Sequence, residues 1–206
     1  MSYQLWLGFM VACWVISISP GAGAIASMSS GLNYGFRRGY WNAVGLQLAL
    51  LVQIGIVAAG AGVLFATTPW AFLAIKWFGV CYLLYLACLQ WRAPVQNIQI
   101  QHESQIKSPA KLVFTGFLVN MSNPKAIVFL LAVLPQFLDL SRPQWPQYVM
   151  MALTMISIDL IVMAGYTGLA AKVLRLLSSP RQQKMMNRSF AILFAAAAGL
   201  LSLVHQ

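Results

Sequence analysis

The sequence predicts an all-α integral membrane protein: six transmembrane helices in two inverted three-helix repeats, with the first and fourth helices broken at proline. Three observations predict this fold: an apolar composition, six long apolar stretches, and two matching proline breaks. The 206 residues are 60% hydrophobic and 8% charged, with a mean hydropathy of +0.75, whereas soluble domains are about 25% charged. We therefore expect residues 1–206 to form one multi-pass membrane domain.

Six apolar stretches are long enough to cross a bilayer, which takes about 20 residues per helix. The first resembles a secretory signal, because Gly21 to Ala24 are small residues of the kind found at cleavage sites. Met1 to Gln4 carry no lysine or arginine, so we expect this stretch to be retained as a membrane helix. The six stretches run roughly over residues 4–27, 41–66, 69–91, 112–136, 147–171 and 188–204. The sixth is short, and if it did not cross, the C-terminus would change sides.

The distribution of basic residues predicts the orientation. The net charge is +10, but the basic side chains lie between the apolar stretches and not on a soluble domain, so we expect no nucleic-acid partner. By the positive-inside rule, the basic loops are cytoplasmic and both termini lie outside. The opposite loops carry Arg142, partly offset by Asp139. The basic loop residues are Arg37, Arg38, Arg92, Lys107, Lys111, Lys172, Arg175, Arg181, Lys184 and Arg188.

The two proline breaks indicate an internal repeat. Ser19-Pro20-Gly21 interrupts the first stretch and Asn123-Pro124-Lys125 interrupts the fourth, 104 residues later. Adding the same 104 residues to the start of the second stretch gives the start of the fifth. Because each half has three spans, the second copy must enter from the opposite face, as in the inverted repeats of transporters. The expected boundaries are about 1–91 for repeat one, 92–111 for a polar linker and 112–206 for repeat two.

The breaks are candidate binding elements. A proline removes a backbone donor and frees a carbonyl, which in hydrocarbon must find another partner. The N-terminal end of a broken helix favours an anion such as a carboxylate, and Lys125 would add a positive charge there. The alternative is that Pro20 and Pro124 are ordinary kinks and that Lys125 extends to the membrane interface.

Asp159 lies near the middle of the fifth stretch, where a carboxylate is costly and therefore a functional candidate. We expect Lys125 to be the partner of Asp159. We also expect the charge of Asp159 to change with its surroundings, as in a proton-coupled carrier. The alternative is a structural buried pair. Neutral hydrogen-bonding side chains at similar depth are Ser17, Ser19, Gln47, Gln53, Asn120 and Asn123.

The remaining reactive residues do not predict an enzyme, a metal site or a cofactor. His102 lies in the linker and His205 lies next to the end, away from any nucleophile within the membrane. Cys13, Cys81 and Cys88 lie in apolar stretches without metal-ligand spacing. Three glycines beside alanines suit close helix packing: Gly55, Gly60 and Gly62.

Three segments carry a family resemblance: SISPGAGAIASMSSGLNYGFRRGYWNAVGLQ, IKWFGVCYLLYL and FLVNMSNPKAIVFLLAVLPQF. With them the chain resembles the lysine exporter (LysE) superfamily, and within it the RhtB branch. The resemblance implies a carrier in the bacterial cytoplasmic (inner) membrane that exports amino acids or derivatives such as homoserine, homoserine lactone or threonine, driven by protons. Family members often carry Ser-Pro-Gly-Pro, whereas Ala22 and Gly23 follow Gly21 here. That departure leaves the substrate open.

The resemblance and the site residues agree on a zwitterionic substrate. Lys125 and the broken helix ends would hold its carboxylate, and Asp159 would hold its ammonium group in competition with a proton. A homodimer is compatible with so small a bundle. Two rival classes remain: an exporter of metal cations, disfavoured by the single carboxylate within the spans, and a membrane scaffold, for which the breaks and Asp159 would be unnecessary.

Overall fold

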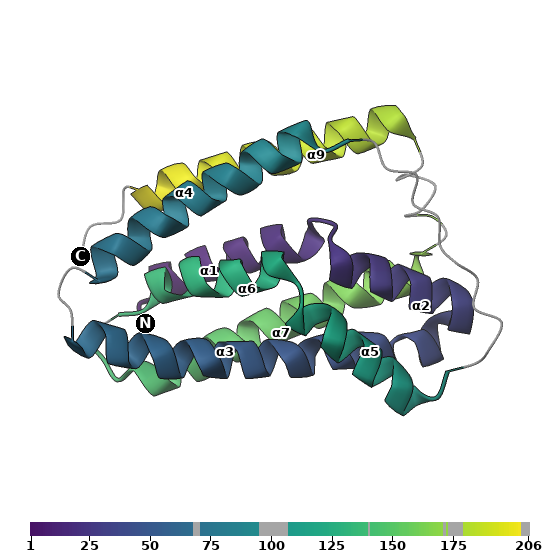
Figure 1. Cartoon of the computed structure of the whole chain (residues 1–206), viewed down its shortest axis with the longest axis horizontal. Helices are drawn as coiled ribbons and strands as arrows, with labels where there is room; N and C mark the ends of the chain where they lie inside the picture. Colours follow the sequence, from purple (N-terminus) through teal and green to yellow (C-terminus); the bar gives the residue numbers. More distant parts are fainter. Residues whose placement is uncertain (68–70, 95–106, 140, 171, 173–178, 203–206) are drawn as a thin grey trace.

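The computed structural model describes residues 1–67, 71–94, 107–139, 141–170, 172 and 179–202 (Figure 1). Within these ranges the chain forms eight α-helices and one short 3₁₀ helix, with no strand. His102, His205 and the middle of the expected linker lie outside the described residues. The elements are α1 (Tyr3–Ile18), α2 (Ala22–Gly39), α3 (Trp41–Thr67), α4 (Ala71–Arg92), α5 (Pro109–Met121), α6 (Pro124–Ala132), η1 (Leu134–Phe137), α7 (Gln144–Gly168) and α9 (Pro180–Ser202).

Both proline breaks are confirmed. The axes of α1 and α2 meet at 55°, and those of α5 and the α6–η1 segment meet at 56°. At the first break, Pro20 has no N–H to continue the α1 ladder, and the helix ends with Ser19 N donating to Val15 O at 3.1 Å. At the second, Pro124 takes the first position of α6, where a proline costs no hydrogen bond.

The described helices account for up to four spans. Trp41–Gly60 of α3 and Gln144–Gly168 are each long and apolar enough to cross a membrane, and each bent pair adds one span if it is counted as a single helix. Helices α4 and α9, at the positions of the expected third and sixth spans, do not meet the same criteria in their described residues. The protein is therefore an all-helical membrane protein with two broken segments.

The helices pack in two groups, the α4–α9 pair and a main bundle of the other helices (Figure 1). Helices α3 and α5 lie against each other, as do α2 and α7, while α4 and α9 form a pair along one side of the bundle. Glycine permits the closest crossings: a Cβ on Gly45 would overlap Val113 O, and one on Gly116 would overlap Asn42 O. The prediction that Gly55 and Gly60 serve close packing is wrong, because a Cβ on either would meet open space. The side-chain surroundings of Gly62 lie outside the described residues.

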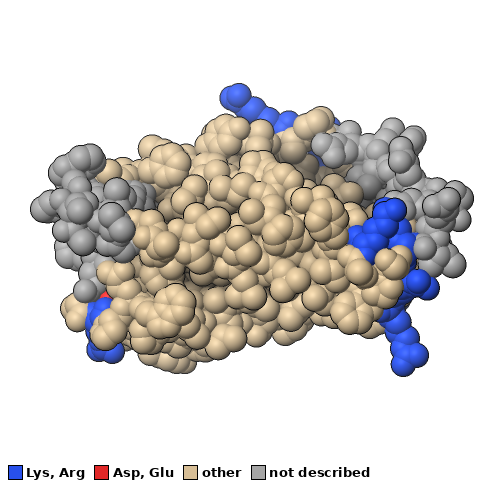
Figure 2. Space-filling view, turned by 60° about the horizontal axis from the view of Figure 1, so that its bottom comes forward, with Lys and Arg blue, Asp and Glu red and all other residues tan. Residues whose placement is uncertain are grey.

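The surface has the charge pattern of a membrane protein. Figure 2 shows Lys and Arg at the right, at the lower left and along the upper edge, with a broad uncharged face between them. Large apolar side chains are exposed on the helices, among them Ile56 on α3 and Leu153 and Ile161 on α7. Such a surface is stable against lipid tails and not against water.

Candidate functional site

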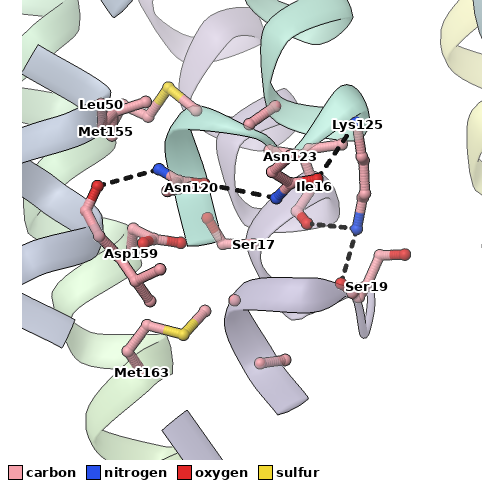
Figure 3. Close-up of a pocket in the computed structure, with 15 residues that line it drawn as sticks. Ile16, Ser17, Ser19, Leu50, Asn120, Asn123, Lys125, Met155, Asp159 and Met163 are labelled. Carbon is pink, nitrogen blue, oxygen red and sulfur yellow. Dashed lines mark hydrogen bonds between the residues drawn. The ribbon is translucent and has the colours of Figure 1, made fainter. Parts of the chain in front are cut away.

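A small cavity of about 60 Å³ lies where the two breaks meet near the centre of the bundle (Figure 3). Residues from both repeats line it, because α1, α2, α6 and α7 converge there. Of the residues that the sequence predicted for the site, seven line this cavity: Ser17, Ser19, Gly21, Asn120, Asn123, Lys125 and Asp159. The two proline breaks and the two ionisable side chains, Lys125 and Asp159, therefore lie at one site.

Lys125 crosses from one break to the other. Its Nζ donates to Ser19 O at 2.7 Å and to Ile16 O at 3.1 Å (Figure 3). In an unbroken helix, residue 20 would donate to the carbonyl of Ile16, which the proline cannot do. The lysine supplies the missing donor, and its charge complements the negative C-terminal end of α1.

Asp159 faces the same cavity from α7. Its Oδ2 accepts a hydrogen bond of 2.6 Å from Gln47 Nε2. The direct Lys125–Asp159 pair expected from the sequence is not among the ion pairs of the described chain. Each charge is instead held by neutral groups on its own side of the cavity.

The second break is fixed by a series of amide hydrogen bonds. Asn123 Oδ1 caps α6 by accepting from Lys125 N at 3.1 Å, and Asn123 Nδ2 donates to Asn120 Oδ1 at 3.3 Å. Asn120 Nδ2 in turn donates to Leu46 O at 2.9 Å, and Gln53 Nε2 donates to Asn120 O at 2.9 Å. These bonds tie α5 and α6 to α3 and orient the start of α6.

The start of α2 has no such cap. Gly21 occupies the N-cap position and makes no side-chain cap hydrogen bond. Gly21 and Gly23 both line the cavity, so the first N–H groups of α2 lie beside it. A Cβ placed on Gly21 would lie 3.7 Å from Lys125 Nζ, so the positive end of α2 and the ammonium group are neighbours. Together they form a site suited to an anion.

Four predicted residues lie outside the cavity lining: Pro20, Gln47, Gln53 and Pro124. Gln47 donates a hydrogen bond to Asp159, and Gln53 donates one to Asn120 O. Pro20 and Pro124 create the two breaks. Sequence reasoning missed Met155 and Met163, which line the cavity on either side of Asp159, and Tyr166, whose hydroxyl donates to Ile18 O at 2.6 Å. Their spacing of four, four and three residues along α7 places them on one helical face, which was the available signal.

The site thus has two poles, one positive and one negative. Lys125 and the start of α2 form the positive pole, Asp159 forms the negative pole, and Leu46, Leu50 and the two methionines supply apolar surface. Within the described residues, no group of three or more histidine, cysteine, aspartate or glutamate side chains could hold a metal ion.

Comparison with known proteins decides the family. Residues 14–204 match the family model of the LysE type translocator. The chain belongs to the LysE family. This LysE-family protein is accordingly a membrane transporter and not an enzyme, and its substrate is a small molecule.

Its relatives include proteins named for efflux. The chain is 37% identical to a homoserine/homoserine lactone efflux protein of Salmonella typhimurium, over 98% of both chains. It is 40% identical to an uncharacterized membrane protein of Vibrio cholerae, again over 98% of both chains. A leucine efflux protein of an Enterobacter species is 25% identical over 96% of this chain and 94% of its own. No solved structure matches the chain.

Proposed function

We propose that the protein exports amino acids or close derivatives, of the homoserine, homoserine lactone or threonine type, from the cytoplasm across the bacterial inner membrane. The observation that carries the proposal is the pair of opposite poles in one cavity between the broken helices. An α-amino acid is itself a dipole of carboxylate and ammonium, so it can bind both poles at once. The names of the efflux relatives support the same substrate class.

The positive pole binds the substrate carboxylate. A carboxylate beside Gly21 would accept from the first N–H groups of α2 and from Lys125 Nζ, which can exchange a carbonyl partner for the stronger charged one. The negative pole binds the ammonium group through Asp159, which Gln47 orients. The methionines flanking Asp159 adapt to side chains of different shape.

Proton coupling follows from competition at the negative pole. With the ammonium group bound, Asp159 is paired and charged. When the substrate leaves, the carboxylate remains in a low-dielectric site with Gln47 as its hydrogen-bond donor, and taking up a proton relieves the cost of that buried charge. One proton then enters as one substrate leaves.

Alternating access uses the two repeats. The near-equal bends of 55° and 56° support an inverted pair of three-helix units, with α4 and α9 as their third spans. The packing supports it as well: the helix after each break contacts the broken segment of the other repeat, α3 against α5 and α7 against α2. The basic loops face the cytoplasm and both termini face outward.

The test is efflux from proteoliposomes. Vesicles containing the purified protein are loaded with labelled homoserine, threonine, leucine or homoserine lactone, and efflux is followed with and without a proton gradient. We expect gradient-stimulated efflux of at least one of these compounds, with protein-free vesicles as the control. Rates equal to those of protein-free vesicles for every compound would refute the proposal.

A further inference from the structure

A basic pocket of about 260 Å³ lies between the end of α4 and the first turns of α9. Figure 1 shows these two segments at the end of the molecule opposite the N-terminus. The pocket shares no lining residue with the central cavity, so it is separate from the proposed export site. Three basic side chains line it, and no acidic residue of the described chain does: the three are Arg92, Lys184 and Arg188.

The three positive charges have no counter-charge within the described chain. The ion pair found there joins Asp139 to Arg142, and none of the three basic residues of the pocket takes part in it. All three side chains are exposed, so they are open to a ligand from outside. Like charges around one pocket repel one another, and a bound anion relieves that repulsion. The charge of the lining therefore selects an anionic ligand.

Two contacts between α4 and α9 fix the walls of the pocket. The guanidinium carbon of Arg188 lies 5.3 Å from the centre of the Trp91 ring, a cation–π contact. Beside it, Gln90 Nε2 donates to Asn187 Oδ1 at 3.0 Å. Both contacts join the end of one helix to the start of the other. The basic groups are thus held in place before a ligand binds, which lowers the entropy cost of binding.

Exposed apolar side chains continue from the pocket along both helices. On α9, Lys184, Arg188 and Ile192 follow one another at a spacing of four residues, so they share a helix face, and Ile192 is 61% exposed. On α4, Leu89 and Trp91 are each 54% exposed. A soluble anion would use the basic groups alone. A lipid would use both parts, with its head group at the charges and its acyl chains along the apolar faces.

We propose that this pocket binds the phosphate head group of an anionic phospholipid. The negative phosphate lies among the three basic side chains, and the acyl chains lie against the exposed apolar faces of α4 and α9. A zwitterionic lipid carries the same phosphate, but its cationic group has no acidic partner in the described lining. The proposed orientation places this end of the molecule in the cytoplasmic leaflet, whose surface is negatively charged.

Native mass spectrometry of the purified protein in detergent tests the proposal. The protein is titrated with dioleoylphosphatidylglycerol or dioleoylphosphatidylcholine, and the apparent Kd of the first bound lipid is measured. We expect phosphatidylglycerol to bind at least tenfold more tightly. The double variant Lys184→Gln/Arg188→Gln should weaken its binding about 30-fold, because each basic residue near an anionic lipid contributes a factor of about five. The charge-preserving variant Lys184→Arg/Arg188→Lys should retain tight binding.

A matched variant separates the pocket from the general basic surface. Arg37→Gln/Lys111→Gln removes two exposed charges outside the pocket and should leave the Kd of phosphatidylglycerol unchanged. Equal weakening by the two glutamine variants, or weakening by the charge-preserving variant, would overturn the pocket as the site. Equal affinity for the two lipids would overturn the preference for an anion. Displacement of phosphatidylglycerol by an equal concentration of glycerol 3-phosphate would assign the pocket to a soluble phosphate and overturn the lipid.

Discussion

At the scale of single residues, the central finding is that Lys125 repairs the break that Pro20 makes. The sequence placed Lys125 and Asp159 in one site, and they do line one cavity. It did not predict that the lysine would bond to the carbonyls of α1, because that contact depends on how close the two breaks come in space. The assignment of both residues to substrate binding stays a proposal.

The Lys125 assignment predicts a selective loss. Lys125→Met removes the charge from the positive pole, so the KM for homoserine efflux should rise by about 10- to 100-fold, the range expected for a charge-assisted hydrogen bond. The KM for homoserine lactone should change much less, because the lactone has no free carboxylate. Efflux assays with both substrates measure the ratio, with Lys125→Arg as the charge-preserving control. Equal losses for the two substrates would exclude a carboxylate contact.

At the scale of helices, the positions of the proline breaks could be predicted from the sequence, whereas the glycines at the helix crossings could not. A proline acts on its own chain, so its effect can be read from the local sequence. Which glycine faces another backbone depends on the rotation of each helix about its axis. Gly45 and Gly116 lie at the α3–α5 crossing, whereas Gly55, in an equally small-residue stretch, meets open space.

A pair of alanine substitutions tests these crossing points. Gly116→Ala forces a methyl group against Asn42 O, so we expect it to destabilise the folded protein by about 1–3 kcal/mol. Gly55→Ala meets no neighbour and should leave stability unchanged or slightly raised, since alanine favours helix. Thermal unfolding in detergent measures both. Equal effects of the two substitutions would show that the α3–α5 crossing is not close.

At the scale of the whole molecule, charge distribution leads to the predicted orientation. Arg37 in the last turn of α2 and Ser141 before α7 are both exposed, and the orientation assigns them to opposite sides of the membrane. In a background with Cys13, Cys81 and Cys88 replaced by alanine, Ser141→Cys should react with an impermeant maleimide in intact cells. Arg37→Cys should react only after the membrane is permeabilised. The reverse pattern would invert the proposed topology.

The most direct test of proton-coupled export is transport driven by a pH difference in the Asp159→Asn variant. The asparagine keeps the size of the side chain and can still bond to Gln47, but it cannot carry the charge that proton and ammonium share. In proteoliposomes, the wild-type protein should move homoserine against its gradient when a pH difference is imposed. The variant, reconstituted to the same density, should not. Full pH-driven transport by Asp159→Asn would contradict the account.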